Sequence, residues 1–323
     1  MKTEALRRRR PAGAASGDPA SQGKTASRAG STGTAARKRS SRVAYAYLAL
    51  PFAFYAVFMI LPWLQTIYLS FFNWDGIGAR TWAGLANYLN VFRIPQLRVA
   101  ILHSFELMIF FCVIPILVAL LLTALMTGPR RPRLGVLRAI IFVPQVLPPV
   151  AVGVMWQWMY GDSGFINQVL KWVGLSGVAR PWLASFSWAF VAVGLVGAWV
   201  TTGLCLAFFV AGAQKVPTEL YEAVQTDGGG LVRQFWSITL PHLRGEIVIA
   251  ATVTAITALG AFDIIYVMTT GGPGTATIVP GVLVYQLGFT TFQVGQASAL
   301  AVVLSALVLL VISVLRIFAR ERP

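Results

Sequence analysis

The chain has 323 residues, of which 57% are hydrophobic and only 11% are charged, and its formal net charge is +15 at pH 7. Soluble domains carry about 25% charged residues, so this composition excludes an ordinary soluble domain and indicates a protein with several membrane helices. The Lys and Arg residues gather in the N-terminal tail and beside apolar runs, which argues against a nucleic-acid-binding protein. Cys112 and Cys205 both lie inside apolar runs, so no disulfide framework is expected.

Residues 1–42 differ from the rest of the chain. They hold 11 of the 26 Lys and Arg residues and are rich in Ser, Ala and Gly. Such a composition buries too little apolar surface to fold, so we expect a disordered basic tail followed by a membrane domain over residues 43–320. Contact of the tail with anionic headgroups is an alternative to a plain solvated tail.

Six apolar runs reach the length of about 20 residues that a membrane helix needs. The first run is too long for the apolar core of a signal peptide and is expected to be a retained helix. The segment 279–289 is too short for a seventh span and is expected to be an external or re-entrant segment. The predicted spans cover approximately residues 44–72, 100–127, 137–160, 186–213, 247–269 and 297–316.

The distribution of Lys and Arg predicts the orientation of these spans. If the N-terminus is cytoplasmic, 21 Lys and Arg residues lie on the cytoplasmic side and five lie outside. Cytoplasmic loops carry an excess of basic residues, so both ends of the chain are expected in the cytoplasm. The loop at 214–246 is then cytoplasmic as well.

Within that loop, the stretch ELYEAVQTDGGG at 219–230 is unusually acidic for this chain. It holds three of the 11 Asp and Glu residues, namely Glu219, Glu222 and Asp227. Pro217 and Thr218 favour the start of a helix, and the glycines at 228–230 favour its end. A second amphipathic stretch follows and is expected to end at Pro241. The pattern predicts two helices joined by a glycine turn, either docking to a partner or serving as an ordinary connector.

The spacing of several residues in this loop resembles the EAA loop of permease subunits in ATP-binding-cassette (ABC) importers. That pattern is Glu-Ala-Ala, three residues, Gly, nine residues and Ile-x-Leu-Pro, and here Val224 replaces the second Ala. In the family this loop forms a coupling helix that docks on the ATPase subunit. The resemblance implies ATPase-coupling roles for Glu222, Ala223, Gly228, Ile238, Leu240 and Pro241.

Other stretches are similar to the carbohydrate branch of this family. They are WAGLANYLNVF (82–92), FVPQVLPPVAVGVMWQWMYGDSGFINQVL (142–170) and FDIIYVMTTGGPGTAT (262–277). The resemblance covers about residues 45–320. It implies an all-α membrane protein with six transmembrane helices in the type I ABC-importer permease fold, located in a bacterial cell membrane.

The chain has no G-x-x-x-x-G-K-[ST] sequence to hold the phosphates of ATP. ATP and Mg²⁺ are therefore expected on a partner ATPase, and no cofactor is expected in this chain. It has only two His and two Cys residues and shows no nucleophile–base motif, so no metal site and no catalytic residue are expected. The resemblance implies as partners an ATPase dimer, a second related permease in a heterodimer, and an extracellular solute-binding protein.

Polar, small and aromatic side chains in the spans suit a sugar, which has apolar C–H faces and a rim of hydroxyl groups. On the fifth span, four small or hydroxyl residues share one face, which fits either close helix packing or a cavity. The expected pathway residues are Gln145, Trp199, Thr201, Thr254, Thr257, Ala258, Ala261 and Asp263.

Ionisable residues inside spans are functional hypotheses by default. Glu106 lies in the outer half of the second span with His103 one turn away, and Asp263 lies in the outer half of the fifth. Three roles stay open for these groups: a proton relay, sugar binding or gating, and a structural hydrogen bond between helices.

The leading function is a permease subunit that moves a sugar into the cell, with di- or oligosaccharides favoured by the resemblance. One alternative is a proton-coupled secondary sugar transporter that uses Glu106 and Asp263. Another is a membrane-embedded enzyme that uses His103 and Glu106. The EAA spacing argues against both alternatives, because neither function needs a cytoplasmic docking helix.

Overall fold

The structure is a computed structural model that describes residues 47–126 and 134–320. The tail at 1–42, which is expected to be disordered, lies outside the described residues. The chain divides into two compact units, Met1–Ile60 and Leu61–Pro323. The second unit holds most of the helices and all of the candidate site residues.

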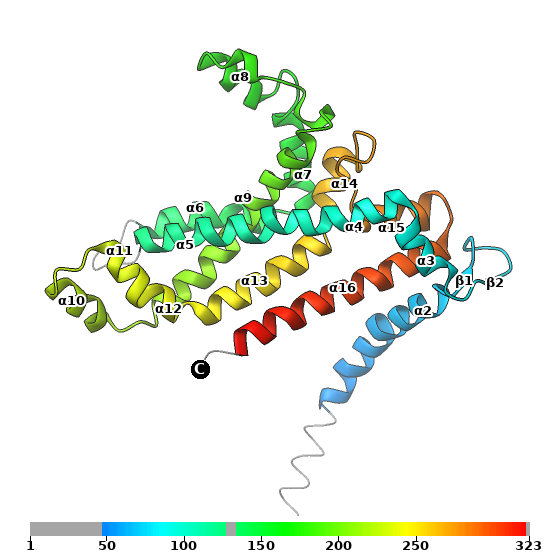
Figure 1. Ribbon diagram of the computed structural model, residues 1–323, viewed down its shortest axis with the longest axis horizontal. Helices are drawn as coiled ribbons and strands as arrows, with labels where there is room; N and C mark the ends of the chain where they lie inside the picture. Colours follow the sequence, from blue (N-terminus) through cyan, green and yellow to red (C-terminus); the bar gives the residue numbers. More distant parts are fainter. Residues whose placement is uncertain (1–46, 127–133, 321–323) are drawn as a thin grey trace, which may run out of the picture. The chain divides into compact units, whose positions relative to one another are not determined.

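The described residues are mostly helical, as the expected all-α class requires (Figure 1). The larger helices are α2 (Leu61–Leu69), α4 (Pro95–Met108), α5 (Ile114–Met126), α6 (Leu134–Val146), α7 (Pro149–Met159), α9 (Ala189–Ala213), α13 (Arg244–Leu259) and α16 (Val294–Arg320). The shorter helices are α3 (Ala86–Arg93), α8 (Phe165–Trp172), α10 (Thr218–Thr226), α11 (Leu231–Gln234), α12 (Leu240–His242), α14 (Asp263–Thr269) and α15 (Pro280–Tyr285).

Short irregular turns and one small hairpin complete the described chain. The strands β1 (Phe72–Asn73) and β2 (Thr81–Trp82) pair antiparallel, with Phe72 opposite Trp82. The π-helical turns are Ala56–Ile60, Ile109–Val113, Phe235–Thr239 and Gln286–Thr290, and the 3₁₀ turns are Ser176–Val178 and Trp182–Ala184.

Among the described residues, four helices are long and apolar enough to cross a membrane without a break. They are Tyr47–Leu69, Pro95–Met126, Ala189–Ala213 and Val294–Ile317. Two bent pairs of helices bring the number to six if each pair is one span. They are Gly135–Val146 with Pro149–Met159, and Leu231–His242 with Arg244–Leu259. The short segment α15 and the turn after it cover only residues 280–290, which agrees with a segment that does not cross the membrane.

The third predicted span, 137–160, is divided into two helices, because α6 and α7 meet at an angle of 99°. Pro148 has an extended backbone (ψ 132°), and Pro149 begins the new helix. A proline disfavours helical geometry at the residue before it, so two successive prolines separate the helices. Pro144, by contrast, stays inside α6.

The fifth predicted span, 247–269, is wrong as one helix. Helix α13 ends at Leu259, and α14 begins at Asp263 after the irregular residues 260–262. Gly260 caps α13, and Phe262 leaves helical geometry (φ −142°, ψ −62°). Asp263 therefore begins a short helix and does not lie two turns inside a long one.

Helix α9 occupies the centre of the bundle and packs against α5, α6 and α13. Its buried residues include Cys205 and Phe209. Cys205 and Cys112 are both free and buried. At Gly203, a Cβ atom would lie only 2.7 Å from the Ile141 carbonyl oxygen and 3.1 Å from the Phe142 Cα. Glycine at this position therefore permits direct backbone contact between α9 and α6.

Figure 1 shows α10 and α11 at one end of the bundle and β1, β2 and α3 at the other. We call these the α10 end and the hairpin end. Helix α16 begins at the hairpin end, where the Val294 N–H donates to the Trp74 carbonyl over 2.9 Å, and runs toward the α10 end. In the hairpin loop, the backbone N–H groups of Ile77 and Gly78 donate to Asp75 Oδ1 and lower the pKa of that carboxyl.

Asn87 fastens α3 to the start of the hairpin. Its side chain is 3% exposed, and its Nδ2 donates to the Ser70 and Phe72 carbonyls over 2.9 and 3.0 Å. We expect Asn87→Ala to destabilise the folded protein by about 2 kcal/mol, because it leaves buried carbonyls without a donor. Thermal unfolding in mild detergent measures this, with Asn90→Ala as the control on the same helix. An equal loss of stability in both variants would contradict the role of Asn87.

Candidate functional site

The loop at 214–246, which we name the coupling loop, contains the predicted helix and glycine stop. Helix α10 begins directly after Pro217, and Gly228 follows it with a left-handed backbone (φ +77°). The Gly228 N–H donates to the Gln225 carbonyl over 2.9 Å, and the Gly229 N–H donates to the Val224 carbonyl over 2.8 Å. This pair of bonds is a Schellman cap, which satisfies the last carbonyls of the helix and favours glycine at its turn.

Helix α10 is attached to the segment that follows it through Tyr221, a contact that the sequence analysis missed. The Tyr221 hydroxyl lies 3.1 Å from Thr239 Oγ1, and both residues are buried. Val216 and Ile238 complete a small apolar cluster around the Tyr221 ring. Of the predicted coupling residues, Ile238 thus packs back on the protein, and Leu240 and Pro241 are half-buried.

The opposite face of α10 is exposed. It carries Glu219, Leu220 and Ala223, and Glu222 lies at its edge beside the cavity described below, so acidic groups flank a small apolar patch. Among the described residues, Glu222 forms no ion pair. A surface of this kind suits a protein partner that offers a pocket with a basic rim.

The prediction that Pro241 ends the second helix is wrong by one residue. Pro241 lies inside α12, and the bend of 68° to α13 follows His242. The π-helical turn Phe235–Thr239 precedes the proline, and the Leu240 N–H donates to the Phe235 carbonyl. We attribute the continuation to this wider turn, which changes the hydrogen-bonding register before the proline.

An ion pair joins the two ends of the coupling loop. Lys215 Nζ, just after α9, lies 3.0 Å from Glu246 Oε1 in the first turn of α13. Because the lysine side chain is 75% exposed, we expect this pair to add little stability. It marks where the loop leaves and rejoins the bundle.

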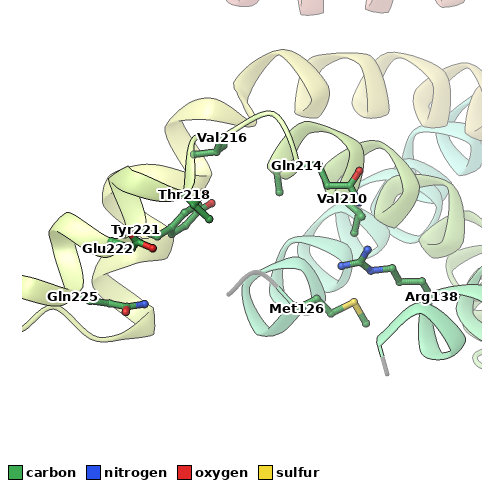
Figure 2. Close-up of a pocket in the computed structure, with 10 residues that line it drawn as sticks. Met126, Arg138, Val210, Gln214, Val216, Thr218, Tyr221, Glu222 and Gln225 are labelled. Atoms are coloured by element: carbon green, nitrogen blue, oxygen red, sulfur yellow. The ribbon is translucent and has the colours of Figure 1, made fainter. Parts of the chain in front are cut away.

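A cavity of about 330 Å³ separates α10 from the ends of α5, α6 and α9 (Figure 2). Glu222, Tyr221 and Gln225 line it from α10, and Arg138 lines it from α6. In Figure 2 the Arg138 guanidinium lies between Val210 and Met126. Among the described residues, this cavity therefore separates α10 from the bundle on this side.

A second cavity of about 250 Å³ lies at the breaks in the third and fifth spans. It brings together five of the eight predicted pathway residues, from α6, α9, α13, α14 and the break between α13 and α14. They are Gln145, Thr201, Thr257, Ala261 and Asp263. Their gathering agrees with a pathway role, which stays a prediction.

Gln145 has the most informative environment in this pathway cavity. Its Oε1 atom is buried and has no hydrogen-bond partner in the described protein. An unpaired buried acceptor costs free energy, so a ligand hydroxyl that donates to it is favoured. Thr201 Oγ1 already donates to the Gly197 carbonyl over 2.8 Å, and Asp263 is exposed.

The other three predicted pathway residues do not line this cavity. Thr254 and Ala258 are fully buried, and Thr254 Oγ1 donates to the Ala250 carbonyl over 2.8 Å. The small-residue face of the fifth span is therefore divided between helix packing and the cavity. Trp199 is 39% exposed and stands edge-on to Trp156, with ring centroids 5.5 Å apart.

His103 and Glu106 have separate environments. His103 Nδ1 lies 2.8 Å from the Ile278 carbonyl, so this side chain joins α4 to the segment before α15. Its ring centroid is 5.0 Å from that of Phe190. Glu106 is exposed on α4, and its side chain forms no ion pair among the described residues. Among the described residues, no three His, Cys, Asp or Glu side chains group as metal ligands.

Comparison with known families identifies the protein class. The model of the family "Binding-protein-dependent transport system inner membrane component" matches residues 116–322. The chain belongs to this family. It is the membrane-spanning permease component of an ABC importer, and family membership favours this function over the proton-coupled carrier.

Two relatives match the sequence of this permease over most of its length. The trehalose/maltose transport system permease protein MalF of Thermococcus litoralis is 32% identical and matches 84% of this chain and 91% of that protein. The diacetylchitobiose uptake system permease protein NgcF of Streptomyces coelicolor is 33% identical and matches 82% of this chain and 78% of that protein.

A solved structure shares the fold of this permease. It is a bacterial alginate ABC transporter in complex with an alginate pentasaccharide-bound periplasmic protein. The TM-score is 0.73 at 20% identity, over 88% of this chain and 96% of that chain. The expected permease fold is therefore confirmed.

Proposed function

We propose that this permease moves a di- or oligosaccharide into the cell. The observation that carries the proposal is the similarity over more than 80% of the chain to two permeases named for disaccharide uptake. The pathway cavity supports it, because hydroxyl and amide groups there meet apolar walls. Sugars present the same combination of polar rim and apolar face.

The proposal includes the orientation and the partners. The α10 end lies in the cytoplasm, as do both chain termini, because 21 of the 26 Lys and Arg residues then lie inside. A separate ATPase dimer binds ATP and Mg²⁺ and docks on α10. A second related permease forms the other half of the pathway, and an extracellular binding protein delivers the sugar. This chain itself holds no cofactor and catalyses no reaction.

Transport then follows from the geometry of the loop. When the ATPase dimer closes on ATP, it displaces the exposed face of α10. Tyr221 and Ile238 link α10 to the second helix of the loop, and that helix leads into α13. Helix α13 carries Thr257 at the pathway cavity, so movement at α10 changes access to that cavity.

Uptake of labelled trehalose, maltose and diacetylchitobiose into proteoliposomes tests the proposal. The complete complex is expected to accumulate at least one of these sugars when ATP and the binding protein are present. Omission of the ATPase should abolish uptake, and collapse of a proton gradient should leave it unchanged. Uptake by this permease alone that disappears with the proton gradient would refute the proposal.

A variant of the pathway cavity gives a sharper test. We expect Gln145→Ala to raise the sugar concentration for half-maximal uptake about tenfold, because the sugar loses a buried hydrogen-bond acceptor. Gln157→Ala is the matched control, since Gln157 is exposed on α7 and does not line the cavity. Concentration-dependent uptake measures both variants. If the two variants behave alike, Gln145 does not contact the sugar.

A further inference from the structure

Within the part of the chain that the structure describes, Arg138 is a cation without a counterpart. It lies in the first turns of α6 and is half-buried. Its Nε atom is buried and has no hydrogen-bond partner, and among the described residues the arginine forms no ion pair. A guanidinium stays protonated in proteins, so it cannot relieve this cost by losing its charge. An anionic acceptor at this position would therefore be strongly stabilised.

Two cavities of different character meet at Arg138. The first is the cavity beside α10 in Figure 2, which is lined by Glu222, Gln214 and Gln225 among others. The second has about 290 Å³ and lies between α6 and α9. Apart from Arg138 its lining is apolar, formed by Ala139, Phe142, Gly203, Leu206, Ala207 and Val210. Arg138 and Val210 belong to both linings.

This arrangement selects a ligand with a negative head and an apolar tail. A small inorganic anion would satisfy Arg138 and leave the apolar slot empty. A neutral lipid would fill the slot and leave the guanidinium unpaired. Slots of this kind between membrane helices, with a basic residue at the mouth, are suited to acidic lipid headgroups.

We propose that an anionic phospholipid from the leaflet at the α10 end occupies both cavities. Its phosphate accepts from Arg138 Nε, and the first part of one acyl chain lies in the slot between α6 and α9. The amides of Gln214 and Gln225 offer further donors to the headgroup. The Glu222 carboxylate faces the same cavity, so the headgroup must be held on the Arg138 side. The lipid would join α6 to the coupling helix where the protein leaves open space.

Native mass spectrometry of the purified transport complex with phosphatidylglycerol tests this proposal. We expect the wild type to hold one tightly bound phosphatidylglycerol at this site. Arg138→Gln should weaken its binding about tenfold, because a charge-assisted hydrogen bond is lost. Ala207→Phe should also weaken lipid binding, because the ring fills the slot. Arg244→Gln is the matched control, since Arg244 is exposed at the start of α13 and lines neither cavity.

The other outcomes are distinct and overturn the proposal. If inorganic phosphate displaces phosphatidylglycerol at equal concentration, the site binds phosphate and not a lipid. If Arg138→Gln retains as much lipid as Arg244→Gln, the guanidinium is satisfied by a partner subunit. The unfolding temperature gives a second measurement. Phosphatidylglycerol is expected to raise it for the wild type and to leave it unchanged for Arg138→Gln. Neither readout depends on which sugar the complex moves.

Discussion

Replacement of Glu222 by lysine is expected to abolish ATP-driven uptake while leaving the permease folded. Glu222 is exposed on α10 and forms no ion pair among the described residues, so the change removes no internal contact. If the ATPase offers α10 a pocket with a basic rim, as proposed, a lysine there places like charges together and costs several kcal/mol. The affinity of the permease for the ATPase should therefore fall about 100-fold or more. Co-purification of the ATPase with the permease measures this loss, and uptake into proteoliposomes measures its consequence.

Asp227→Lys provides the matched control for this prediction. Asp227 caps the last turn of the same helix, and a lysine there suits the negative end of the helix dipole. The control should retain ATPase and uptake near the wild-type level. Equal losses in both variants would mean that the charge of the whole loop matters and that Glu222 has no specific contact.

Replacement of Gly203 by valine is expected to prevent formation of the folded permease. The new Cβ would lie 2.7 Å from the Ile141 carbonyl oxygen, and the obstructing atoms belong to backbone that cannot rotate away. Overpacking a tight core costs about 1–3 kcal/mol or more, and here it also forces α6 away from α9. We expect a large loss of monodisperse protein in size-exclusion chromatography and a lower unfolding temperature for the remainder.

Gly135→Ala is the control for Gly203→Val on the neighbouring helix. A Cβ added at Gly135 meets no atom within 4 Å, and alanine is the better helix former. This variant should unfold at or slightly above the wild-type temperature. A loss of folded protein as large as that of Gly203→Val would show that the α6–α9 contact is not the cause.

The apolar runs predicted the spans well, because a membrane helix leaves a long uninterrupted pattern in the sequence. The breaks within two of them were harder to predict. Pro148 and Pro149 stand at the first break, although the angle of 99° depends on how α7 packs. A single glycine, Gly260, stands at the second. Glycine is common in membrane helices and therefore marks a break poorly.

Site residues were predictable where their chemistry is distinctive. They were unpredictable where the rotation of a helix decides which side chains face the cavity. Gln145 and Asp263 were identifiable as polar groups in apolar runs, and both line the pathway cavity. The sequence could not separate Thr257, which lines the cavity, from Thr254, which packs in the core. Tyr221 escaped notice because its partner, Thr239, is 18 residues away. Arg138 resembled any basic residue that flanks a span.

The bond between Tyr221 and Thr239 makes α10 the short arm of a lever. Helix α13, the long arm, has 16 residues and measures about 24 Å at 1.5 Å per residue. A stiff arm of that length converts a small tilt near the bend after His242 into a larger displacement at its far end, where Thr257 lines the pathway cavity. The permease would thus amplify the motion of its ATPase mechanically. Weakening the contact between Tyr221 and Thr239 should lower the amount of sugar moved per ATP hydrolysed, even where the ATPase still binds normally.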